Sequence, residues 1–189
     1  MTAAECVVAV AAALEGLGIP FMVVGSFSSN VYGIARSTKD ADFVIQLGDR
    51  SIGSLAAALG SDFGLDSQLA FETVTGTTKF RLTHRDTAFT IELFALSQDP
   101  HDQSRFARRV LRDIAGQTLY VPTAEDVIIT KLRWALRLNR RKDVDDVQGI
   151  LDVQTGKLDL DYLRQWTDQH GTSGLLEQML STGHAGEGH

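Results

Sequence analysis

The sequence predicts an α+β fold, in which a mixed β-sheet is flanked by helices and followed by a helical C-terminal segment. Two observations support this prediction. Short apolar runs and alternating apolar and polar residues, both typical of strands, fill much of the first two-thirds of the chain. Helical patterns fill the last third. We therefore expect a core over residues 1–121, a helical segment packed on it over 122–182, and a disordered tail over 183–189.

The first part of the chain predicts helices that alternate with two strands. Residues 3–16 are rich in alanine and predict a helix. The apolar run 21–24 predicts a buried strand, and a helix is expected over 26–34. Residues 40–47 alternate acidic and apolar side chains, which indicates a strand with one wet edge, and residues 51–63 indicate the next helix.

The middle of the chain predicts a β-hairpin. Residues 80–83 and 89–94 both show period-2 patterning and are joined by a polar turn. A further short strand over 119–121 ends at Pro122. Thr123 then caps the first of four expected helices, which cover about 123–138, 142–153, 159–169 and 175–180.

Composition describes one domain of ordinary size, with 189 residues of which 43% are hydrophobic and 22% charged. The net charge of −6 argues against coating nucleic acid widely, although basic residues cluster over 105–112 and 131–142. A single cysteine excludes an intramolecular disulfide. No apolar stretch is long enough to span a membrane, and the N-terminal segment lacks the features of a signal peptide. We therefore expect a cytoplasmic protein without a membrane partner.

Three carboxylates are the candidate metal ligands. Asp40 and Asp42 are two residues apart on one predicted strand, so they share one face of it. Glu92 lies between Ile91 and Leu93 and points away from its apolar neighbours. If the two strands are adjacent, the carboxylates meet and can hold Mg²⁺ or Mn²⁺, which take hard oxygen ligands. The alternative interpretation is a set of surface carboxylates on an edge strand.

A candidate phosphate-binding turn precedes these acids. Gly25 and Ser26 stand between an apolar strand and a helix, where glycine allows close backbone approach and the helix N-terminus attracts anions. Simple capping of the helix by Ser26 is the alternative. Arg36 and Lys131 are candidate contacts for a triphosphate, although Lys131 equally fits a lysine that extends from a helix edge to solvent.

Asp143 and Asp146 lie on one face of a predicted helix. They fit ion pairs with Lys131 or Arg133 of the preceding helix better than they fit metal binding. His84, His101 and His170 show no metal-ligand spacing, and we expect them on the surface or in loops.

These residues resemble the signature of the DNA polymerase beta-type nucleotidyltransferase superfamily. The resemblance rests on Gly25-Ser26, on Asp40-Ala41-Asp42 and on Glu92, and the spacing from Arg36 to Asp42 resembles an R-x-T-x-D-x-D motif. Residues 125–131 and 142–147 resemble the downstream lysine and K-D-x-x-D helices of the abortive-infection (AbiE-type) toxins. The likeness covers about residues 5–165 and implies the nucleotidyltransferase fold.

The resemblance also implies a reaction. A nucleotidyltransferase of this kind would move the nucleoside monophosphate of an NTP to an acceptor hydroxyl of RNA such as tRNA, of a protein or of a small molecule. Asp40 and Asp42 would hold Mg²⁺, Gly25 and Ser26 the triphosphate, and Glu92 would be a metal ligand or a base. A toxin with an antitoxin partner is one setting. The alternative is a catalytically silent copy of the fold that binds a nucleotide or a partner protein.

Overall fold

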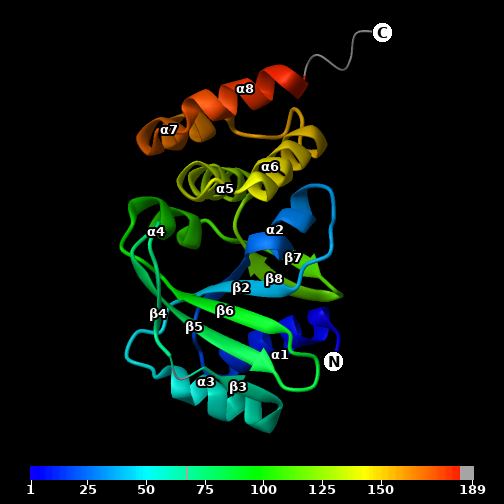
Figure 1. Cartoon of the computed structure of the whole chain (residues 1–189), viewed down its shortest axis with the longest axis vertical. Coiled ribbons are helices and arrows are strands. Elements are labelled where there is room, and N and C mark those ends of the chain that lie inside the picture. The colour runs from blue at the N-terminus through cyan, green and yellow to red at the C-terminus, as the bar shows by residue number, and fades with distance from the viewer. Residues whose placement is uncertain (67, 184–189) are drawn as a thin grey trace. The chain divides into compact units, whose positions relative to one another are not determined.

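Six strands form a mixed sheet in the computed structural model, which describes residues 1–66 and 68–183 (Figure 1). The strands are β1 (Phe21–Val24), β2 (Asp40–Ile45), β3 (Phe63–Leu65), β4 (Ala70–Glu72), β5 (Thr77–His84) and β6 (Thr90–Ala95). Their order is β1-β2-β6-β5-β3, with β4 also paired to β5. β2 and β6 are parallel, and the other neighbours are antiparallel. The predicted mixed sheet and the hairpin of β5 and β6 are therefore confirmed.

Contacts divide the described chain into two compact units. The first contains Met1–Phe27 and Ser37–Pro122, and the second contains Ser28–Arg36 and the chain from Thr123 onward. The segment Ser28–Arg36, which we expected with the N-terminal core, thus groups with the C-terminal helices. Of the tail over 183–189, only Gly183 lies within the described residues.

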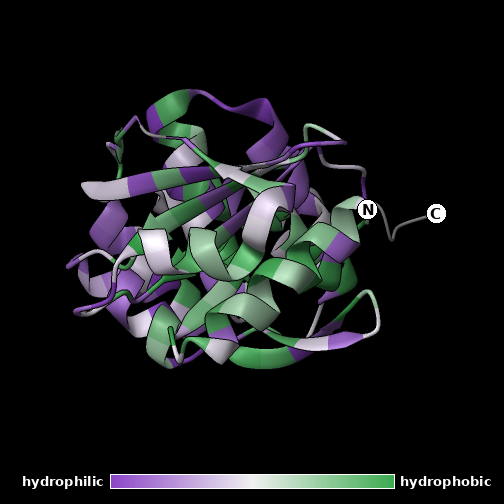
Figure 2. Cartoon of the chain, turned by 90° about the horizontal axis from the view of Figure 1, so that it is seen from below, coloured by the Kyte–Doolittle hydropathy of each residue, from purple (hydrophilic) through white to green (hydrophobic). Residues whose placement is uncertain are grey.

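The first unit buries one face of its sheet beneath two helices, α1 (Ala3–Gly16) and α3 (Ile52–Leu59) (Figure 1). Period-2 alternation directs Ala41, Phe43 and Ile45 of β2 to this face, and all are buried. Figure 2, which colours the chain by hydropathy, shows hydrophobic residues in helices and strands, some of which also carry hydrophilic stretches, and hydrophilic residues in many of the loops. The unit also contains α4 (Pro100–Ala107) and a separate hairpin of β7 (Val110–Ile114) and β8 (Gln117–Val121).

The second unit is helical. Its helices are α5 (Ala124–Leu138), α6 (Arg141–Val153), α7 (Leu160–His170) and α8 (Ser173–Gly183), joined by the end of α2 (Gly25–Tyr32). The hydroxyl of Thr123 accepts from the N–H of Asp126 at the start of α5, as expected of a cap. None of the described helices combines the length and the apolar character that a membrane span needs.

Several short elements were not predicted. β3, β4 and β7 have at most five residues each, too few to establish a period, and α4 is a mostly polar helix. The expected helix over 51–63 ends at Leu59, because Gly60 adopts a positive φ of 69°. The prediction of surface histidines was wrong for His84 and His101, which are buried.

Close backbone packing holds the segment Ser28–Arg36 against α6. A β-carbon at Gly33 would lie 3.0 Å from Cγ1 of Ile150 and 3.1 Å from the carbonyl carbon of Gly149. The side-chain amide of Gln154 donates to the carbonyl oxygen of Tyr32 over 2.8 Å. A side chain at position 33 would therefore be tightly packed, and the backbone of Gly149 and Ile150 would have to shift to admit it.

We predict that Gly33→Ala lowers the free energy of unfolding by about 1–3 kcal/mol, the usual cost of overpacking. Gly174→Ala is the control, because a β-carbon at Gly174 in α8 meets nothing within 4 Å. It should be neutral or stabilising, since alanine favours helix. Urea unfolding measures both variants, and equal stabilities would contradict the packing described.

Candidate active site

The pairing of β2 with β6 places two of the predicted carboxylates side by side. Asp42 is the register partner of Glu92, so both side chains leave the same face of the sheet from strands about 4.8 Å apart. Ala41, between the two aspartates, is buried on the opposite face. The condition set for these carboxylates to meet, that the two strands be adjacent, is therefore fulfilled for Asp42 and Glu92.

Asp42 also touches the glycine turn. The antiparallel partner of Asp42 in β1 is Val24, and Gly25 follows directly with a φ of 64°. A β-carbon at Gly25 would overlap the carboxylate of Asp42, which would then have to move away from the turn. Ser26, which is buried, continues from this turn into α2. The turn and the carboxylate thus form one continuous site in the first unit.

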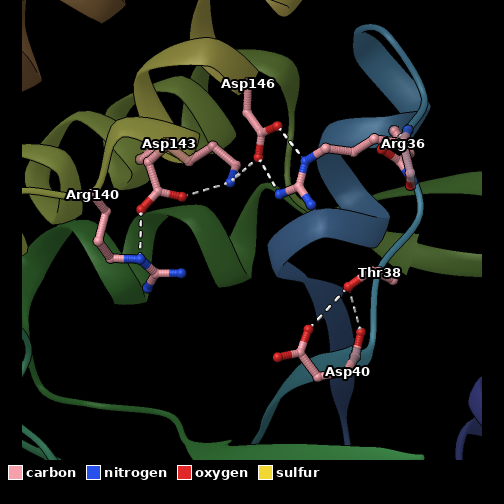
Figure 3. Close-up of polar contacts among 8 residues, drawn as sticks. Arg36, Thr38, Asp40, Arg140, Asp143 and Asp146 are labelled. Atoms are coloured by element: carbon pink, nitrogen blue, oxygen red, sulfur yellow. Dashed lines mark hydrogen bonds and ion pairs between the residues drawn. The ribbon is translucent and has the colours of Figure 1, made fainter.

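Asp40 begins β2 and is exposed. The hydroxyl of Thr38 lies 2.9 Å from both Oδ1 and the carbonyl oxygen of Asp40 (Figure 3). A hydroxyl has one proton to donate, so Thr38 bonds one of these oxygens at a time. The contact restrains an otherwise solvent-facing carboxylate on β2, the strand that also carries Asp42.

Glu92 is engaged by two cations of β5. Its Oε1 accepts from Nζ of Lys79 over 2.9 Å and from Nη2 of Arg81 over 3.1 Å. Within residues 1–66 and 68–183, no three His, Cys, Asp or Glu side chains group in a way that could hold a metal ion. In the structure Glu92 is paired with Lys79 and Arg81, and the assignment of Asp40, Asp42 and Glu92 as metal ligands stays a prediction.

A second cluster of charges lies within the helical unit. Nζ of Lys131 donates to Asp143 over 3.0 Å and to Asp146 over 2.7 Å, which confirms the predicted pairing of these aspartates with the preceding helix. Arg36 binds the two oxygens of Asp146 in a fork, through Nε over 2.7 Å and Nη2 over 2.9 Å. Nε of Arg140 lies 3.1 Å from Oδ2 of Asp143 (Figure 3). The structure thus pairs Arg36 and Lys131, our candidate triphosphate contacts, with carboxylates.

This arrangement shifts the ionisation of Asp146. Burial raises the pKa of this carboxyl. Hydrogen bonds from Arg36 and Lys131, together with their positive charges, lower the pKa by more than burial raises it, so it lies below its ordinary value. Asn30 also holds Arg36, since its side chain donates to the Arg36 carbonyl over 2.8 Å and accepts from the Arg36 N–H over 3.1 Å.

Thr38 was noted from the sequence only as a position of the R-x-T-x-D-x-D motif, and no role was predicted for Lys79 or Arg81. The sequence did contain a signal for the last two, because residues at i and i+2 of one hairpin strand share a face. Pairing that strand with residues 89–94 would have placed Lys79 and Arg81 beside Glu92. The missing information was the hairpin register, which the turn over residues 84–87 does not reveal.

The chain matches the model of a family described as nucleotidyl transferase AbiEii toxin, Type IV TA system, over residues 9–186. No curated protein matches it.

Solved structures share the fold. The antibiotic-resistance factor ANT(2'')-Ia aligns over 95% of this chain and 97% of its own, with a TM-score of 0.61 at 15% identity. A structure of ANT(2'')-Ia in complex with adenylyl-2''-tobramycin aligns over 90% and 97%, with a TM-score of 0.61 at 14% identity. An antigenic nucleotidyltransferase-like protein from Paracoccidioides brasiliensis aligns over 94% and 92%, with a TM-score of 0.57 at 21% identity. At these identities the likeness shows the fold alone, and it confirms the predicted nucleotidyltransferase fold.

We predict that Gly25→Ala destabilises the protein more than Gly48→Ala. Both glycines have a positive φ, of 64° and 57° respectively. Each alanine substitution should therefore lower the free energy of unfolding by about 1–2 kcal/mol, because alanine disfavours the left-handed backbone conformation. A β-carbon at Gly48 meets nothing within 4 Å, whereas one at Gly25 collides with Asp42. The difference in unfolding free energy between the two variants reports the collision, and no difference would show that Asp42 is not held against the turn.

We predict that Asp146→Asn lowers the free energy of unfolding at pH 7 by about 1.5–3 kcal/mol, the range for hydrogen bonds to charged groups. Because the folded-state pKa of Asp146 is lowered, its ionised form stabilises the fold fully above the ordinary aspartate value of about 3.9. That stabilisation is lost as the pH falls through the lower, folded-state value. The gap between wild type and variant should therefore shrink with acid.

Asp145→Asn is the control, because the neighbouring Asp145 is exposed. Urea unfolding from pH 7 down to about pH 3, below the ordinary aspartate value, measures the three proteins. A gap for Asp146→Asn that does not change with pH would contradict the ion-pair assignment.

Proposed function

Since the chain belongs to the AbiEii nucleotidyltransferase toxin family, we propose that it transfers the nucleoside monophosphate of an NTP to an acceptor hydroxyl with the help of a divalent cation. Membership of this family identifies the chain as a nucleotidyltransferase enzyme. The observation that supports the site is the position of Asp42, which contacts the Gly25 turn and neighbours Glu92 in register.

Asp40 and Asp42 fit a divalent cation. They are two hard oxygen donors on one strand face, and Mg²⁺ is commonly held by one or two carboxylates together with substrate phosphates and water. A third protein carboxylate is therefore not required. When bound, the cation would neutralise charge on the triphosphate and polarise its α-phosphate.

Gly25 and Ser26 are assigned to the triphosphate. Without a β-carbon, Gly25 presents bare backbone beside Asp42, and α2 begins at this turn. The N-terminal end of a helix attracts phosphate through its N–H groups and its dipole. No nucleotide contact is assigned to Arg36 and Lys131, because Asp143 and Asp146 already balance their charges in the helical unit.

Glu92 is assigned to the acceptor hydroxyl. As the acceptor oxygen forms a bond to the α-phosphorus, the bond from that phosphorus to pyrophosphate breaks, and Glu92 takes the hydroxyl proton. Lys79 and Arg81 orient the carboxylate on the same sheet face as Asp42. Positioning of the reacting groups is the main contribution that these side chains make.

The family description also supports a setting. We place the reaction in the cytoplasm, with an antitoxin protein as the partner that restrains the toxin. The tobramycin adduct belongs to ANT(2'')-Ia, and at 14% identity it does not identify the acceptor of this chain.

Replacement of Asp42 tests the proposal. We predict that Asp42→Asn lowers the transfer of label from α-labelled NTP into a bacterial cell extract by at least about 100-fold, a loss typical of a removed transition-state contact. Asp49→Asn, which removes an exposed carboxylate from the loop after β2, should transfer label at the wild-type rate. Binding of Mg²⁺-NTP, followed by calorimetry, should weaken only in Asp42→Asn. Equal labelling by wild type and Asp42→Asn would overturn the assignment.

A further inference from the structure

The sheet face that carries Asp42 and Glu92 continues with positive charge on the next strand. Glu92 is the register partner of Asp42 on one side and of Arg81 on the other. These three residues therefore form one row across β2, β6 and β5, with Cα atoms about 4.8 Å apart from strand to strand. Lys79 stands two residues before Arg81 and shares its face.

The two cations retain capacity for a further anion. The side chain of Arg81 is 50% exposed, and one of the five N–H donors of its guanidinium binds Glu92. Nζ of Lys79 binds the same Oε1 and lies 5.7 Å from the centre of the Phe94 ring, which restrains its position. Lys79 and Arg81 thus share the single carboxylate of Glu92, and these three side chains together carry one net positive charge.

We propose that Lys79 and Arg81 form an anion subsite that binds a phosphate group of the acceptor. This inference rests on the proposed function, in which Glu92 receives the acceptor hydroxyl. An acceptor whose hydroxyl is held at Glu92 would extend over the neighbouring strand β5, where it would meet Lys79 and Arg81. Arginine suits this task because its planar fork matches phosphate oxygens.

The subsite selects acceptors by charge. A phosphate-bearing acceptor gains charge-assisted hydrogen bonds beside the reacting hydroxyl, whereas a polyamine-like acceptor meets two like charges and is repelled. The acceptor is therefore a molecule with a phosphate close to the hydroxyl that is modified. Both the terminus of a nucleic acid and a small phosphorylated metabolite have this chemistry.

Binding of small probes to the full-length protein tests the subsite. The probes are the dinucleotide ApA, which has one phosphodiester and a free terminal ribose, ribose 5-phosphate, and adenosine as the phosphate-free control. Tobramycin serves as the cationic probe. Dissociation constants are measured by NMR, following the Nε–H signal of Arg81, which is assigned by its loss in Arg81→Lys. Titrations with and without a non-hydrolysable Mg²⁺-NTP analogue keep the result independent of nucleotide binding.

We expect ApA or ribose 5-phosphate to shift the Arg81 signal, and the probe that does so identifies the source of the phosphate. Arg81→Gln and Lys79→Gln should each weaken that probe about tenfold, as expected for one lost charged hydrogen bond, while Arg81→Lys should recover part of the affinity. Arg50→Gln removes an exposed cation elsewhere in the first unit and should change nothing. Tobramycin should bind the wild type more weakly than Lys79→Gln.

Two results would overturn the subsite. One is a phosphate-bearing probe that binds Arg81→Gln as tightly as wild type, and the other is the absence of any shift with either phosphate-bearing probe. Thermal melting of each variant shows whether it is folded, and exposed Arg81 can be replaced with little cost to stability. Failure of the proposed function has a different signature, since Asp42→Asn would then bind Mg²⁺-NTP normally.

Discussion

The parallel pairing of β2 with β6 is the constraint on which the candidate site depends. It fixes Asp42 opposite Glu92, and the antiparallel pairing of β1 with β2 fixes Asp42 beside Val24 and so against the Gly25 turn. A shift of either register by one residue would send Asp42 to the buried face, where an unpaired carboxylate is costly. The apolar face of β2 therefore selects the register that exposes the acids.

The charge cluster of the helical unit has a geometric consequence rather than a large energetic one. The desolvation free energy of Asp143, Asp146 and Lys131 offsets much of the free energy gained from their mutual attraction. Such a network is therefore weak evidence for stability. Through the fork between Arg36 and Asp146, however, it fixes the end of the segment Ser28–Arg36 on α6. In the sequence this segment lies between Gly25-Ser26 and Asp40.

Much of the fold and part of the site could be predicted from the sequence, because strong local patterns coincide with long elements. The helix α1, the strands β1 and β2 and the pairing of Lys131 with Asp143 all follow from periodicity and charge spacing. Elements with weak local signals, such as β3 and α4, depend on tertiary pairing and could not be predicted. The engagement of Glu92 by Lys79 and Arg81 was missed for a similar reason, since a hairpin register links residues that no spacing rule connects.

The most direct test of the central claim is a crystal structure of the protein with Mn²⁺ and a non-hydrolysable NTP. Anomalous scattering locates the manganese independently of any interpretation of the electron density. We predict a manganese peak within coordination distance of the Asp40 and Asp42 carboxylates, with the triphosphate on the backbone of Gly25 and Ser26. Manganese and nucleotide bound elsewhere, with Asp42 still packed against an unoccupied turn, would contradict the account.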